Sequence, residues 1–131
     1  MKTMSEKSIA QKMLFKPGQK VFLVTPPPDY IELLGQIPDG VEILTRTTVP
    51  VDIIQLFSAS RKGLEEQMPW LKPLIKPGGM LWITYYKGTA RVKTDINRDT
   101  INAYAHTLGL EGVSIISVNE DGSAMRFKGL S

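Results

Sequence analysis

One segment of the chain, residues 76–98, predicts an α/β fold by itself. It reads KPGGMLWITYYKGTARVKTDINR. A Pro-Gly-Gly turn precedes an apolar run at residues 80–85, and a basic loop then leads into the start of a helix. This order of turn, buried strand, loop and helix is typical of a parallel sheet with helices packed on it. Ligands usually bind at the carboxyl ends of such strands, so we expect the loop to lie at the functional edge.

The rest of the chain continues this alternation of strands and helices. Short apolar runs predict strands at residues 21–25, 41–44, 51–57, 80–85, 113–118 and 124–128, with helices in the longer intervals. The last two strands flank an Asn-Glu-Asp-Gly turn, which predicts an antiparallel hairpin. The sequence therefore predicts a reduced Rossmann-like α/β sheet. It is mostly parallel, has helices on both faces and ends in an antiparallel hairpin.

Helix ends and large side chains give more local predictions. Asp29 is expected to cap the second helix, and Thr94 or Asp95 the last one, because each precedes a run with helical apolar spacing. Trp70 and Trp82 are both expected in the core.

Composition narrows the classes of protein that remain. A length of 131 residues predicts a single domain over residues 1–131, with a core at 8–128 and a loose segment at 1–7. The absence of cysteine excludes disulfides, cysteine-based zinc sites and a thiol nucleophile, and a single histidine disfavours any metal site. No apolar run is long enough to span a bilayer, so a cytoplasmic protein with no membrane partner is expected.

Two sets of motifs carry a resemblance to known families. The segment LxxLIKPGGMLWIT, at residues 71–84, resembles the one that leads into the fifth strand of class I S-adenosylmethionine-dependent methyltransferases. Over residues 8–128 the chain resembles a family of small bacterial proteins of unknown function. The motifs that it shares with them are KPG at 16–18 with Val21, the segment 76–88 and the segment 92–99. The resemblance implies a reduced methyltransferase-like fold and no established activity.

The chain departs from the methyltransferase pattern where the cofactor would bind. The family has a glycine-rich loop after its first strand, whereas this chain has Thr25, Pro26, Pro27 and Pro28 there. Three prolines remove three backbone donors that could hold an anion. The acid expected after the second strand is replaced by Leu-Thr-Arg-Thr at residues 44–47. No cofactor is therefore predicted, and S-adenosylmethionine is disfavoured.

The predicted ligand site combines the basic loop with the other strand ends. Residues 87–93 carry three positive charges and no acid, and a basic loop that enters a helix favours phosphate or carboxylate. The candidate ligand-binding residues are Thr25, Asp29, Ser58, Arg61, Tyr86, Lys87, Gly88, Arg91, Lys93, Asp95, Asn97 and Arg98. The alternative is a solvated loop paired with nearby acids, with Asp29 and Ser58 serving only as helix caps. No catalytic residue is predicted.

Three hypotheses about function follow. The first is a non-catalytic, methyltransferase-like scaffold that binds an anionic small molecule or a protein partner at the strand carboxyl edge. The alternative is a divergent S-adenosylmethionine-dependent methyltransferase or another transferase. The third, a weak nucleic-acid binder, is disfavoured because a basic patch of three residues provides only a small counterion-release term. The oligomeric state stays open.

Overall fold

A computed structural model describes residues 8–87, 94–119 and 121–129. The strands are β1 (Lys20–Val24), β2 (Glu42–Leu44), β3 (Val51–Phe57), β4 (Ile75–Tyr86), β5 (Leu110–Ser117) and β6 (Gly122–Gly129). The helices are α1 (Ile9–Lys12), α2 (Tyr30–Leu33), α3 (Arg61–Leu71) and α4 (Arg98–Thr107), with a 3-10 turn η1 (Lys72–Leu74) before β4. None of the helices in these ranges is long and apolar enough to cross a membrane.

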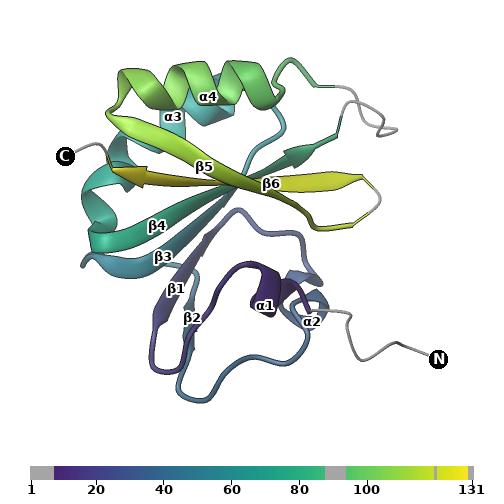
Figure 1. Cartoon of the computed structure of the whole chain (residues 1–131), viewed down its shortest axis with the longest axis vertical. Helices are drawn as coiled ribbons and strands as arrows, with labels where there is room; N and C mark the ends of the chain where they lie inside the picture. The colour runs from purple at the N-terminus through teal and green to yellow at the C-terminus, as the bar shows by residue number, and fades with distance from the viewer. Residues whose placement is uncertain (1–7, 88–93, 120, 130–131) are drawn as a thin grey trace.

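The six strands form one sheet in the order β2-β1-β3-β4-β6-β5. The pairs β1–β2, β1–β3 and β3–β4 are parallel, whereas β6 is antiparallel to both β4 and β5. The predicted fold class is therefore confirmed, including the terminal hairpin. Figure 1 shows α3 and α4 on one face of the sheet and α1 and α2 on the other.

The face under α3 and α4 carries an apolar core. Leu64 and Met68 of α3 and Ile101 and Ala105 of α4 are buried against side chains of the sheet that include Ile54. These helical positions follow the spacing of three and four residues that the sequence shows. The amphipathic pattern of the two longer helices therefore predicts which side of each helix packs on the sheet.

The opposite face is covered by much shorter helices. Helices α1 and α2 contain four residues each. Trp82 of β4 is fully buried beneath them, and its indole nitrogen donates to the Met13 carbonyl at 3.2 Å. This hydrogen bond ties the end of α1 to the centre of the sheet. The expectation that Trp82 lies in the core is confirmed.

The expectation for Trp70 is wrong. Its side chain is 46% exposed, on the outer part of α3. The ring packs at 6.2 Å from that of Phe22, and the indole nitrogen donates to the Gln67 amide oxygen at 2.8 Å. Leu64, Met68 and Leu71 occupy the buried stripe of α3. Trp70 therefore lies outside that stripe.

Two predicted helix caps are also wrong. Helix α4 is capped by Asn97, which exchanges hydrogen bonds with Thr100 in a reciprocal capping box, and not by Thr94 or Asp95. Asp29 precedes α2, but its side chain makes no capping hydrogen bond. Sequence spacing located both helices, but the capping residue depends on the backbone angles immediately before each helix.

Candidate functional site

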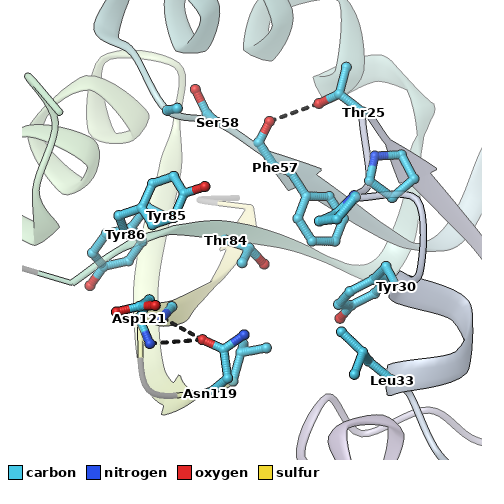
Figure 2. Close-up of a pocket in the computed structure, with 15 residues that line it drawn as sticks. Thr25, Tyr30, Leu33, Phe57, Ser58, Thr84, Tyr85, Tyr86, Asn119 and Asp121 are labelled. Atoms are coloured by element: carbon cyan, nitrogen blue, oxygen red, sulfur yellow. Dashed lines mark hydrogen bonds between the residues drawn. The ribbon is translucent and has the colours of Figure 1, made fainter. Parts of the chain in front are cut away.

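A pocket of about 470 Å³ opens at the carboxyl edge of the sheet, on the face covered by α1 and α2. The ends of β1, β3 and β4 form its base, and α2 and the β5–β6 turn form two of its sides (Figure 2). Its lining residues are Thr25, Pro26, Pro27, Tyr30, Leu33, Phe57, Ser58, Ala59, Thr84, Tyr85, Tyr86, Val118, Asn119, Asp121 and Gly122. We call it the edge pocket. It lies where ligands bind in parallel α/β sheets.

A buried polar network lies beneath the edge pocket. Gln55 is fully buried in the central strand β3. Its amide nitrogen donates to the Thr84 hydroxyl at 2.8 Å and lies 2.7 Å from the Tyr30 hydroxyl, which donates to the amide oxygen at 2.9 Å. A buried amide without partners would be costly, so these bonds permit Gln55 to stay in the core. Tyr30 and Thr84 also line the pocket, so the network is part of its floor.

Tyr30 connects the network to an aromatic wall. Its ring meets that of Phe57 in an edge contact, with centroids 4.6 Å apart and planes at 75°. Burial raises the pKa of Tyr30 to about 12, and the hydrogen bond with Gln55 opposes that rise. The phenol therefore keeps its proton at neutral pH and acts as a hydrogen-bond donor.

Thr25 closes the gap between β1 and β3 at the rim of the pocket. Its backbone φ is +54°, a conformation that is strained for a β-branched residue. Its hydroxyl lies 2.7 Å from the Val24 carbonyl and 2.8 Å from that of Phe57. The hydroxyl is thus engaged with the protein's own backbone across two strands.

The residues after β1 do not fit S-adenosylmethionine in the way that the family resemblance implies. Pro26, Pro27 and Pro28 have no backbone N–H, and Thr25 directs its hydroxyl to Phe57. Strand β2 ends at Leu44 with no acid directly after it. A ligand of this site would have to be held by the aromatic walls and the polar floor, because the usual donors and carboxylate are missing.

A second concavity lies between the start of α4 and the terminal hairpin. This groove, of about 460 Å³, is lined by Tyr85, Lys87, Asn97, Arg98, Asp99, Ile115 and Ser123. The Lys87 ammonium donates to the Ser117 hydroxyl at 2.7 Å, and the Arg98 guanidinium lies 3.8 Å from the Asp99 carboxylate. Both cations already have partners in the chain.

Tyr85 lines both the edge pocket and the groove. Burial raises its pKa. The charge of Arg98 lowers the pKa, that of Asp99 raises it, and a hydrogen bond with Ser123 lowers it. This tyrosine is therefore also protonated at neutral pH.

The structure distributes the predicted site residues over several places. Thr25, Ser58 and Tyr86 come together in the edge pocket, whereas Lys87, Asn97 and Arg98 line the groove. Asp29, Arg61 and Asp95 line neither. Gly88, Arg91 and Lys93 lie outside the described residues. The predicted single site therefore corresponds to two separate concavities, and binding at either stays a prediction.

Three of these residues have a structural explanation. The Asp95 carboxylate accepts a hydrogen bond from the backbone N–H of Arg61 at 2.7 Å, so it caps the start of α3 from a distant segment. The Arg61 side chain pairs with Glu65 at 3.0 Å, one turn along α3. Ser58 donates to the Ser60 carbonyl at 3.0 Å. Asp95 thus caps a different helix from the one predicted.

Sequence reasoning missed several residues of the edge pocket, including Thr84, Asn119 and Asp121. One signal was present: Gln55 is a polar residue in the middle of the apolar run VDIIQLF, and a buried amide requires partners. It points to a polar network, although not to its members. Asn119 and Asp121 lie in the hairpin turn, whose position above β4 follows only from the pairing of β6 with β4.

Solved structures resemble this fold at low sequence identity. DhpI in complex with SAH matches with a TM-score of 0.62 and 12% identity, over 92% of this chain and 82% of that one. A SAM-dependent methyltransferase from Aquifex aeolicus matches with a TM-score of 0.59 and 16% identity, over 89% and 85% of the two chains.

A TehB-like SAM-dependent methyltransferase from Corynebacterium glutamicum matches with a TM-score of 0.59 and 11% identity, over 93% of this chain and 87% of that one. At these identities the likeness shows a methyltransferase-like Rossmann fold and no activity.

No protein-family model and no curated protein matches this chain. Membership of the small bacterial family therefore stays a prediction. In the parts of the chain that the structure describes, no group of three or more His, Cys, Asp or Glu side chains could hold a metal ion.

Proposed function

We propose that the chain is a divergent methyltransferase whose small-molecule site is the edge pocket. The observation that carries this proposal is the pocket itself, which opens at the carboxyl ends of β1, β3 and β4. Parallel sheets bind ligands at this edge, and an apolar pocket with a few convergent polar groups is typical of a small-molecule site. The fold that the chain shares with SAM-dependent methyltransferases supports the same assignment.

The edge pocket has features that suit a planar organic ligand. Tyr30 and Phe57 form one wall, Tyr86 lies on the opposite side, and Thr84 lies between them (Figure 2). Aromatic side chains hold flat ring systems by stacking, and a floor hydroxyl can orient one polar group of the ligand. These residues take the place of the missing glycine-rich loop, so the proposal assigns no cofactor pose based on that loop.

Isothermal titration calorimetry with S-adenosylmethionine and S-adenosylhomocysteine tests the proposal. The wild-type chain should bind at least one of them with a Kd in the micromolar range. Tyr86→Ala removes one wall and should weaken binding by about tenfold, in line with the energy of aromatic stacking. Trp70→Ala is the matched control, because Trp70 is an exposed aromatic residue on α3 and does not line the pocket. Absence of binding for both compounds would refute the methyltransferase assignment.

A second candidate function is supported by the groove. There a non-catalytic scaffold would bind an anionic small molecule, or an acidic segment of a partner protein, through Lys87, Asn97 and Arg98. Two cations beside the first turn of α4 favour phosphate or carboxylate. Titration with inorganic phosphate distinguishes the candidates, because Arg98→Ala should abolish phosphate binding and leave S-adenosylhomocysteine binding unchanged. Phosphate binding that survives Arg98→Ala would exclude this groove as the site.

A further inference from the structure

The basic loop at residues 87–93 predicts a positively charged site, but the described residues that line the edge pocket do not carry positive charge. Among the described residues, none of its lining side chains is a lysine or an arginine, and the charged one is Asp121. A bound anion requires positively charged or multiple N–H donors to replace its water. The prolines after β1 also remove backbone donors from this rim. The pocket therefore favours a ligand that is neutral or positively charged.

The aromatic walls add a preference for positive charge. Tyr30 and Phe57 on one side and Tyr86 on the other enclose the same space (Figure 2). The faces of aromatic rings carry partial negative charge and attract organic cations, which is how proteins hold quaternary ammonium groups. Tyr86 is 36% exposed, so part of its ring is accessible from the pocket side.

Asp121 is held at the rim by the backbone of the hairpin turn. Its N–H donates to the Asn119 amide oxygen at 2.9 Å, and its carbonyl accepts from the Lys87 N–H at 2.8 Å. Its carboxylate forms no ion pair with any residue in the described ranges. The Lys87 ammonium instead donates to the Ser117 hydroxyl. A carboxylate thus borders a space with aromatic walls, and none of the described residues that line that space is a lysine or an arginine.

We propose that the edge pocket binds an organic cation, specifically an ammonium group attached to an apolar body. Its positive charge would lie between the Tyr86 ring and the Asp121 carboxylate, and its apolar part would contact Phe57. This inference rests on the part of the proposed function that makes the edge pocket the small-molecule site. It adds the chemical class of the ligand.

Choline and its uncharged analogue 3,3-dimethylbutan-1-ol provide a matched pair of probes, since they have the same shape and differ in charge. Each is titrated into ¹⁵N-labelled protein, and the amide signals of residues such as Phe57, Tyr86 and Gly122 are followed by NMR. Choline should bind about fivefold more tightly than the analogue, as expected for a cation beside aromatic rings and a carboxylate. Raising the salt concentration should reduce the difference.

Two variants and a control locate the effect. Asp121→Asn and Tyr86→Leu should each reduce the preference for choline to about twofold or less, with little change for the neutral analogue. Asp39→Asn removes the same charge near Gly18, at the opposite edge of the sheet, and should leave the preference unchanged. The NMR spectrum of each variant also reports whether it is folded.

The outcomes separate this inference from the proposed function. Equal affinity for the two probes, no binding of either, or a preference that survives Asp121→Asn would overturn the inference. Binding of S-adenosylhomocysteine without a preference for choline would overturn the inference and leave the methyltransferase proposal standing. A preference for choline that depends on Asp121, without binding of either adenosyl compound, would support the inference and refute the methyltransferase assignment.

Discussion

The face of the sheet under α3 and α4 is covered by helices of 11 and 10 residues, whereas the opposite face is covered by two helices of four residues each. The first face has an apolar core with Ile54 and Leu56 of β3 in it. The second contains the buried polar network around Gln55 and, at its carboxyl edge, the edge pocket.

This difference indicates how the chain combines stability with an open site. The long amphipathic helices bury most of one face, so that face needs no polar network. On the other face α2 is too short to cover the ends of β3 and β4, and Tyr30 and Leu33 therefore form the side of a pocket. The hypothesis that the site lies on the thinly covered face can be tested by comparing substitutions on the two faces.

The largest expected effect compares the two tryptophans. Trp82→Ala should destabilise the protein by about 3–5 kcal/mol, because it leaves a cavity beneath α1 and α2 and removes the hydrogen bond to Met13. Trp70→Ala, on the other face, should cost about 1 kcal/mol or less, because the side chain is 46% exposed. Urea denaturation measures both, and similar losses would contradict the burial assigned to the two rings.

A smaller effect is expected from the polar network. Gln55→Leu removes the hydrogen-bond partner of the buried Tyr30 hydroxyl, so it should lower the free energy of unfolding by about 1–3 kcal/mol. Adding Tyr30→Phe removes the hydroxyl that has lost its partner, so the double variant should regain part of the stability that the single variant loses. Urea denaturation measures the free energy of unfolding of both variants. A double variant that is less stable than Gln55→Leu would show that the network is not what holds Gln55 in the core.

The smallest expected effect compares helix caps on the two faces. Asn97→Ala removes the side chain that caps α4 and should cost about 1 kcal/mol, measured as a shift of the thermal midpoint. Asp29→Ala should change stability by less than about 0.5 kcal/mol, because Asp29 makes no capping bond to α2. A loss at Asp29 as large as that at Asn97 would indicate that α2 depends on a cap after all.

Much of the fold could be predicted because it rests on local patterns. The apolar run at 51–57 predicts β3, and the spacing of Leu64, Met68 and Leu71 predicts the buried stripe of α3. Strand and helix periods are properties of neighbouring residues, so the sequence carries them directly. The candidate site was predicted only in part: Thr25, Ser58 and Tyr86 line one pocket, while Lys87 and Arg98 line another groove.

By itself, the sequence determined the order of the elements, the terminal hairpin and the absence of a glycine-rich loop after the first strand. Each of these features depends on residues that are adjacent in the sequence. Only the tertiary structure decided that Asp95 caps α3 and that Asp121 borders the aromatic walls. These facts depend on contacts between segments 30 or more residues apart, such as Asp95 with Arg61, which are fixed by sheet order and helix packing. No local pattern of residues encodes such contacts.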